Sequence, residues 1–215
     1  MKKVALGSIA ALLALFAVLL FRAPPGPRSL RAFAPDRTAQ LELEMWQAYY
    51  QKEKPRLFVL LATLMHEQYR YSWAKAISAA LHLARAAATF GDARSGYERV
   101  LPDLEDAYRI ARDWTSAGFD PRDVARAELA WWVARRIPEE RSAENVGRLI
   151  AAEYALLYET RADRVLEAGR LRAEAGALRD EGGAAADWPR VAALLQESYR
   201  SLHAAVSAPE EVRHR

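Results

Sequence analysis

The chain has 215 residues, of which 52% are hydrophobic and 27% charged, with ten glycines, ten prolines and no cysteine. This balance excludes a disordered chain, a collagen-like chain and a disulfide scaffold. Alanine makes up about a fifth of the chain, arginine outnumbers lysine about five to one, and β-branched residues are sparse. Because alanine and arginine favour helices and β-branched residues favour strands, the composition predicts an all-α protein.

The net charge of +3 is concentrated near the N-terminus. Five basic residues precede the first acidic residue, Asp36, and they are Lys2, Lys3, Arg22, Arg28 and Arg31. From Asp36 onward, 26 basic residues face 28 acidic ones, which leaves a net charge of −2. Binding to phosphates requires a positive surplus, so we expect no nucleic-acid partner. The basic N-terminal stretch instead suits the surface of an anionic membrane.

Residues 1–22 have the pattern of a transmembrane signal-anchor. An apolar run from Val4 to Phe21, interrupted only by Gly7 and Ser8, is followed by Arg22. A run of this length at a helical rise of about 1.5 Å spans roughly 27 Å, close to the hydrocarbon core of a bilayer. The alternative is a cleaved signal peptide, which usually has a shorter apolar run and a nearby small-residue cleavage site. The proline-rich sequence that follows here favours the anchor.

The predicted anchor implies a protein that crosses the inner (cytoplasmic) membrane of a bacterium once. The positive charges on the two sides of the apolar run nearly balance, so they do not decide the orientation. A very short tail leading into an apolar run resembles an export signal, which keeps its N-terminus in the cytoplasm. We therefore expect the rest of the chain on the periplasmic or extracytoplasmic side.

Beyond the anchor, the sequence predicts three further regions. Residues 23–37 contain four prolines and are expected to form a short, semi-stiff linker that holds the domain away from the membrane. Residues 38–208 are expected to form an α-helical domain. Residues 209–215 are expected to be a polar tail.

Apolar residues recur at helical spacing through most of residues 38–208. The expected helical segments are 38–52, 55–90, 97–114, 121–136, 143–158 and 188–206, and the fifth is open to continuing as a charged helix to residue 179. Asp120-Pro121 and Ser142 are helix-start signals, whereas Gly91, Gly118 and Gly182-Gly183 are expected to end helices. Six or seven helices with short connections predict a compact multi-helix bundle. A short helical-repeat solenoid is the alternative, although no repeat at a 34-residue period is found.

Motifs of known chemistry are missing from the sequence. It has no phosphate-binding glycine loop, no Gly-x-Ser-x-Gly and no His-Glu-x-x-His, and its four histidines lack the spacing of zinc ligands. A di-iron bundle needs two Glu-x-x-His pairs, but Arg70 follows Glu67 and Leu156 follows Glu153 at the position of the histidine. We therefore expect no catalytic residues, no metal and no cofactor.

Several charged residues nevertheless fall on apolar helix faces. The candidates for a buried polar network or pocket are Glu44, His66, Glu67, Arg70, Glu128, Arg135 and Glu153. Glu128 shares a helix face with Trp131 and Arg135, which places a carboxylate at the expected centre of the bundle. An isolated buried charge is too costly to persist, so these residues are expected to pair with one another, to form hydrogen bonds with tyrosine or to line a wet cavity. Arg135 and Arg70 are the candidate cations for Glu128.

The pattern as a whole favours a membrane-anchored interaction or scaffolding module over an enzyme. The aromatic stretches Trp46–Tyr50 and Tyr69–Trp73 suit either a core or a protein-binding helix surface, because Trp and Tyr are enriched in binding hot spots. The charged stretch Arg161–Arg179 is interpreted as a solvated helix face, with an antiparallel coiled-coil contact as the alternative. The alternative function is a small-molecule or metal-binding helical-bundle enzyme with a pocket lined by Glu, Arg, Tyr and Trp.

Overall fold

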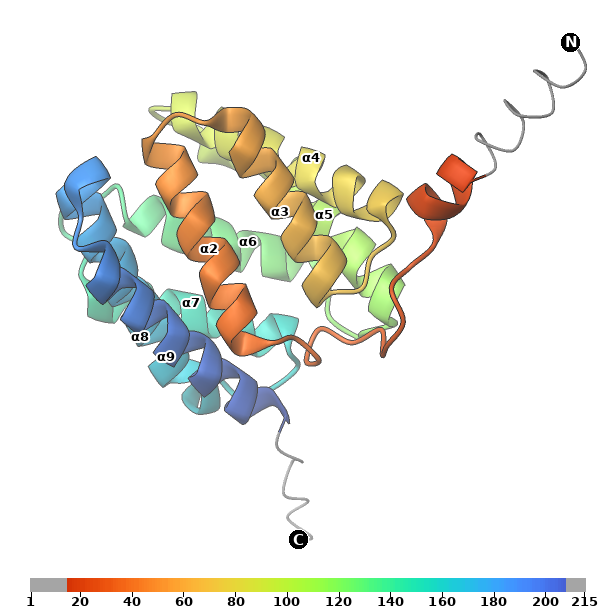
Figure 1. The fold of residues 1–215 in the computed structure, drawn as a ribbon. Helices are drawn as coiled ribbons and strands as arrows, with labels where there is room; N and C mark the ends of the chain where they lie inside the picture. The colour runs from red at the N-terminus through yellow and green to blue at the C-terminus, as the bar shows by residue number, and fades with distance from the viewer. Residues whose placement is uncertain (1–14, 208–215) are drawn as a thin grey trace, which may run out of the picture.

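In the computed structural model, residues 15–207 are described and all of their regular structure is helical (Figure 1). The prediction of an all-α protein is therefore confirmed. The helices of the domain are α2 (Pro35–Tyr50), α3 (Lys54–Gln68), α4 (Trp73–Asp92), α5 (Leu101–Thr115), α6 (Pro121–Ala134), α7 (Ala143–Leu157), α8 (Ala162–Gly182) and α9 (Trp188–Ser207), with short 3₁₀ turns at Tyr97–Val100 and Gly183–Ala185.

Side-chain caps and prolines set the helix starts. The Asp120 side chain accepts a hydrogen bond from the Arg122 N–H, and Pro121 occupies the first turn of α6. The Ser142 hydroxyl caps α7 in the same way by accepting from the Asn145 N–H. Both groups satisfy backbone donors that have no partner inside a helix. The two predicted helix starts are therefore confirmed.

The helices form a closed bundle. Each domain helix packs against the next one along the chain, and α2 also packs against α9, so the first and last helices of the domain are neighbours (Figure 1). Helix α8 lies between α7 and α9 and has its most extensive contacts with these two. In a solenoid each repeat contacts only adjacent repeats. The bundle prediction is confirmed, and the solenoid alternative is wrong.

Two expected segments have different bounds because the chain turns within them. The segment 55–90 divides into α3 and α4, and Arg70 takes a left-handed conformation between them with φ 58°. Likewise the continuation of α7 to residue 179 is interrupted near Glu159, which has φ 48°. A left-handed residue cannot continue a right-handed helix, so α8 begins anew at Ala162.

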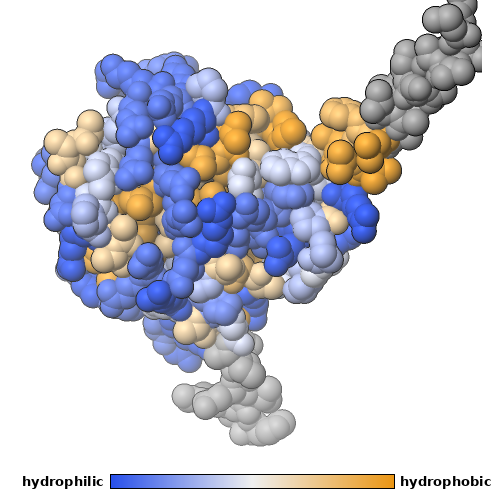
Figure 2. All heavy atoms as spheres, viewed as in Figure 1, coloured by the Kyte–Doolittle hydropathy of each residue, from blue (hydrophilic) through white to orange (hydrophobic). Residues whose placement is uncertain are grey.

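The predicted anchor lies mostly outside the described residues, which begin at 15. Residues 15–21 are helical and carry exposed large hydrophobic side chains, coloured orange beside the domain in Figure 2. No helix within residues 15–207 is both long enough and apolar enough to cross a membrane. The expected polar tail, 209–215, also falls outside the described part of the chain.

The expected linker 23–37 is partly built into the domain, which corrects its predicted extent. Leu30 and Phe33 are only 6% and 5% exposed and belong to the main hydrophobic core. The Phe33 ring lies 5.2 Å from the His203 ring and 6.3 Å from the Tyr158 ring. Helix α2 begins at Pro35, three residues earlier than expected. Burial of two large apolar side chains fixes residues 30–37 to the bundle, so any spacer to the anchor is shorter than predicted.

Candidate functional site

A cavity of about 200 Å³ lies inside the bundle, and every helix from α2 to α9 contributes to its wall. Three carboxylates and one guanidinium line it, together with six tyrosines and an apolar side. The charged residues are Glu42, Glu128, Glu153 and Arg172, and the tyrosines are Tyr69, Tyr71, Tyr108, Tyr154, Tyr158 and Tyr199. Buried ionisable groups are rarely gathered in this way around a space, so this cavity is the candidate site.

Glu128 and Glu153 meet at one tyrosine. The Tyr108 hydroxyl oxygen lies 2.7 Å from Glu128 Oε2 and 3.1 Å from Glu153 Oε1. The Trp131 indole N–H donates to Glu153 Oε2 across 2.6 Å. Helices α5, α6 and α7 thus bring two carboxyl groups together, and the sequence placed both of these glutamates on apolar helix faces.

The contacts of Tyr108 imply that the two carboxyl groups share a proton. A tyrosine hydroxyl has a single proton to donate, so it cannot serve two carboxylates at once. Burial, followed by the negative charge of Glu153, raises the pKa of Glu128 to about 8. A protonated Glu128 donates to the Tyr108 oxygen, Tyr108 donates to Glu153, and all the contacts are satisfied. Burial also raises the pKa of Glu153, but Arg172 and the Trp131 hydrogen bond oppose this rise.

On the opposite side of the network, Glu42 pairs with Arg172. Arg172 Nη2 donates to Glu42 Oε1 across 2.6 Å, and the Tyr199 hydroxyl donates to Glu42 Oε2 across 2.6 Å. Burial alone raises the pKa of Glu42, yet the Arg172 charge and these hydrogen bonds hold it below its usual value. Glu42 and Arg172 are therefore both ionised. This pair joins α2 to α8 and Tyr199 adds α9.

A close crossing of α7 and α8 positions part of this network. Gly147 and Gly169 face each other there, and a Cβ atom on Gly147 would lie 2.8 Å from the Arg170 Cα atom. The two backbones can approach this closely only because neither residue has a side chain. Glu153 and Arg172 follow their respective glycines within two turns, so both are carried to the cavity wall.

Arg135 is not the cation of the site, contrary to the prediction. It forms an ion pair with Asp180, which also accepts from Arg179 across 2.8 Å. The guanidinium groups of Arg135 and Arg172 both lie over the Trp131 ring, at 5.9 and 5.1 Å from its centroid. Only Arg172 lines the central cavity, whereas Arg135 lines outer pockets. The Arg135 side chain extends to Asp180 on α8 and does not pair with Glu128.

Four other candidates also lie apart from the cavity. Glu44 accepts from Gln40, and Glu67 pairs with Arg37 at a half-exposed position. The His66 ring stacks on Trp73 with centroids 4.0 Å apart, and its Nδ1 lies 2.7 Å from the Tyr71 carbonyl oxygen.

Arg70, the fourth of these candidates, donates to the Glu67 carbonyl oxygen across 2.8 Å. Its Nε is a buried donor without a partner among the described residues. Of the seven predicted residues, only Glu128 and Glu153 line the cavity.

Sequence reasoning missed Glu42 and Arg172. Glu42 is three residues from Ala39 and Met45, so its helical position did indicate the buried face of α2. Arg172 belongs to the charged stretch 161–179, which was interpreted as exposed to solvent. The buried face of α8 consists largely of alanine and glycine, and it also includes the larger residues Val165, Leu171 and Arg179. The interpretation of 161–179 as a solvated face is wrong on this side, because alanine and glycine let α7 and α9 approach closely.

Most of the aromatic side chains in the stretches Trp46–Tyr50 and Tyr69–Trp73 pack inside the domain and not on a binding surface. Tyr71 is fully buried, Tyr69 lines the cavity, and Trp46 packs beneath the Arg179 guanidinium at 4.0 Å. Tyr49 and Trp73 are the exposed members of the two stretches. Tyr69 and Tyr71 instead form part of the internal site.

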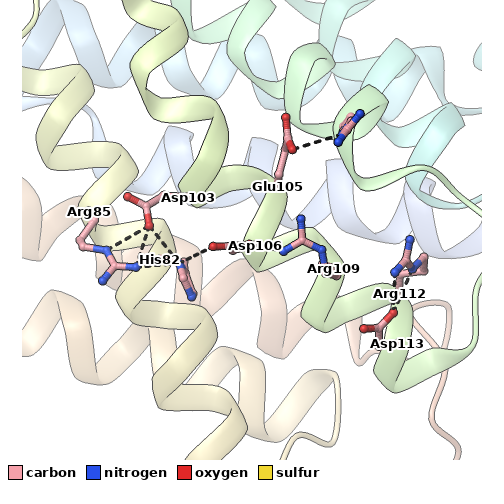
Figure 3. A network of polar contacts seen from close by, with 9 residues as sticks. His82, Arg85, Asp103, Glu105, Asp106, Arg109, Arg112 and Asp113 are labelled. Atoms are coloured by element: carbon pink, nitrogen blue, oxygen red, sulfur yellow. Dashed lines mark hydrogen bonds and ion pairs between the residues drawn. The ribbon is translucent and has the colours of Figure 1, made fainter.

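A second polar network lies between α4 and α5 on the surface (Figure 3). Asp103 Oδ1 lies 2.9 Å from His82 Nδ1 and 2.7 Å from Arg85 Nη2, and the figure shows further pairs along α5. These side chains are accessible to water, and Arg85 is largely exposed. Exposed ion pairs of this kind contribute about 0–1 kcal/mol each, so they align two helices without forming an enclosed site.

Within the described residues, no three histidine, aspartate or glutamate side chains form a group that could hold a metal ion. In comparisons with known proteins, no family model, no curated protein and no solved structure matches the chain. The function is therefore argued from the cavity itself.

Proposed function

We propose that the helical domain binds a small molecule in its central cavity. The observation that carries this proposal is the space of about 200 Å³ whose wall combines three carboxylates, one arginine and six tyrosines with apolar side chains. A few placed polar groups on a mostly apolar wall are typical of ligand sites. A purely structural ion-pair network needs no such space. The proposed role is binding, and it takes the pocket from the alternative function in the sequence analysis without its catalysis.

A cavity-filling variant tests this proposal. Ala79 lines the cavity and is 2% exposed, so Ala79→Leu places three more carbon atoms in or against the space. We expect ligand-observed NMR to detect binding of fragments with about six to ten heavy atoms to the wild type, since a dry cavity of about 150 Å³ already holds benzene. Binding should be lost in Ala79→Leu. The proposal is wrong if no fragment distinguishes the two proteins.

We further propose that residues 1–22 attach this domain to the inner membrane, with the domain on the periplasmic side. The length of the apolar run Val4–Phe21 and the exposed apolar surface of residues 15–21 support this proposal. The protein should stay with membranes after a carbonate wash, and its N-terminus should not begin beyond Phe21. A reporter fused after Arg215 should be active outside the cytoplasm. Release by carbonate would contradict the anchor.

An interaction or scaffolding role is the second candidate. Large apolar or aromatic side chains are exposed on the successive helices α2, α3 and α4, and they include Tyr49, Val59 and Leu81. Exposed apolar side chains suit a protein partner when they lie close together. If this role is correct, the wild type should co-purify with a specific membrane or periplasmic protein, and Val59→Asp should lose that protein without a change in its melting temperature.

A further inference from the structure

The wall of the central cavity carries more negative than positive charge. Glu42 and Arg172 neutralise each other by direct contact, which leaves Glu128 and Glu153 to face the space. These two hold one proton between them when Glu128 is neutral, so one negative charge remains. The nearest other cations, Arg135 and Arg179, are engaged by Asp180 and do not line this cavity.

A second feature of the wall is a hydrogen-bonding group without a partner. Tyr154 on α7 is 5% exposed, and it lines the cavity one residue after Glu153. Among the described residues its hydroxyl forms no hydrogen bond. The hydroxyl of this cavity-lining residue is therefore a polar group that is available to a ligand.

The rest of the wall suits a compact apolar body. Helices α3 and α4 contribute Leu61, Leu64, Met65, Ala79 and Leu83. The tyrosine rings add faces of negative electrostatic potential, which attract cations in desolvated sites. One side of the cavity is thus acidic and aromatic, while the other is hydrocarbon.

We propose that the cavity takes a small organic cation, a protonated amine with a short apolar body, whose ammonium group lies beside Glu128 and Glu153. This inference rests on the proposed binding function and names its ligand class. An ammonium group offers three donors and no acceptor, which matches a wall of carboxylate oxygens and a tyrosine hydroxyl. The apolar body then lies against α3 and α4. An anion of the same size meets uncompensated carboxylate charge and is excluded.

Amine binding and the proton on Glu128 compete. The titratable groups that face the pair are Tyr108 from α5, Glu42 from α2, Arg172 from α8, Tyr199 from α9, Tyr154 from α7, and Tyr69, Tyr71 and Tyr158 from the connecting segments. The groups from α3 and α4 are apolar. A bound cation favours the ionised form of Glu128, so binding releases the proton. Affinity for an amine should therefore rise with pH below the pKa of Glu128, by up to tenfold per pH unit.

A matched pair of probes tests the ligand class. Benzylamine and benzyl alcohol share size and shape but differ in charge, and the full chain in lipid nanodiscs is titrated with each by calorimetry. We expect benzylamine to bind at least tenfold more tightly, with affinity that rises from pH 6 to pH 8. Glu128→Gln leaves the charge of Glu153, so it should abolish the rise of affinity with pH while it keeps the fold. The surface variant Glu67→Gln is the control and should behave as the wild type.

The outcomes separate the ligand class from the binding function. If benzyl alcohol binds as tightly as benzylamine and Ala79→Leu abolishes both, the cavity binds small molecules but the cation inference is wrong. If neither probe binds, or if Ala79→Leu changes nothing, the binding function itself is overturned. An affinity for benzylamine that still rises with pH in Glu128→Gln would also contradict the inference.

Discussion

Gly147 and Gly169 meet at the closest approach of α7 and α8, and a Cβ atom on Gly169 would overlap the Gly147 carbonyl oxygen. The crossing fixes the positions of α7 and α8 along each other, and these helices carry Glu153 and Arg172 to the cavity. Backbone atoms at such a contact cannot move aside as a flexible side chain can. The pair of glycines therefore determines both the packing of the bundle and the geometry of its polar centre.

Gly169→Ala should destabilise the domain by about 1–3 kcal/mol, because overpacking at this crossing forces the two helices apart. Gly176 offers a matched control in the same helix, since nothing lies within 4 Å of a Cβ atom placed there. Gly176→Ala should be neutral or stabilise by about 0.5–1 kcal/mol through helix propensity. Denaturant unfolding measures both. Equal effects at the two positions would mean that α7 and α8 do not cross as described.

Arg172→Met should destabilise by about 3–5 kcal/mol, since removing one partner strands a buried charge on Glu42, which is 4% exposed. Arg135→Met is the control and should cost less than about 1 kcal/mol, because Asp180 is accessible to water and keeps Arg179.

The double variant Arg172→Met/Glu42→Gln should recover part of the loss, since no buried charge is then left without a partner. Thermal melts compare the four proteins. A larger loss for Arg135→Met than for Arg172→Met would restore Arg135 as the central cation.

The comparison of these two arginines indicates how far the sequence predicts the site. Local signals were sufficient for the starts of α6 and α7, because the caps at Asp120 and Ser142 act within one helix. They also placed Glu128 and Glu153 on buried faces. Which cation meets them depends on how helices far apart in the chain are arranged, and Arg172 lies on a helix whose buried face is mostly alanine and glycine. Hydrophobic periodicity does not detect such a face.

The same limit applies to Glu42 and to residues 30–37. Glu42 has the helical spacing of the buried face of α2, but its partners Arg172 and Tyr199 come from α8 and α9, which are distant in the sequence. The proline-rich composition predicted a free linker over 23–37. Composition does not indicate whether two large apolar residues within such a segment are buried in the core. Leu30 and Phe33 are buried there, against residues that are distant in the sequence.

Phe33→Ala should therefore destabilise the domain by about 3–5 kcal/mol, the usual cost of truncating a buried phenylalanine. The ring packs among Tyr158, Tyr199 and His203. Phe21→Ala is the control, because Phe21 is 68% exposed and lies outside the core, and it should leave the melting temperature of the domain unchanged. If Phe33→Ala melts like the wild type, residues 30–34 are a free linker after all.

Glu128 should make the domain less stable as pH rises. Its pKa is about 8 in the folded protein and near 4.5 when unfolded, so between these values the folded state binds the extra proton. The stability that this proton contributes is complete below about pH 4.5 and is lost as pH rises towards 8, by up to about 1.4 kcal/mol per pH unit. Glu153, whose pKa is also raised, acts in the same direction.

Glu128→Gln keeps a hydrogen-bonding side chain without the titration, so its stability should change less between pH 5 and 8 and should exceed that of the wild type at pH 8. Denaturant unfolding at each pH measures both proteins, with Glu67→Gln as the surface control. Parallel pH profiles for wild type and Glu128→Gln would show that the two carboxyl groups at Tyr108 share no proton.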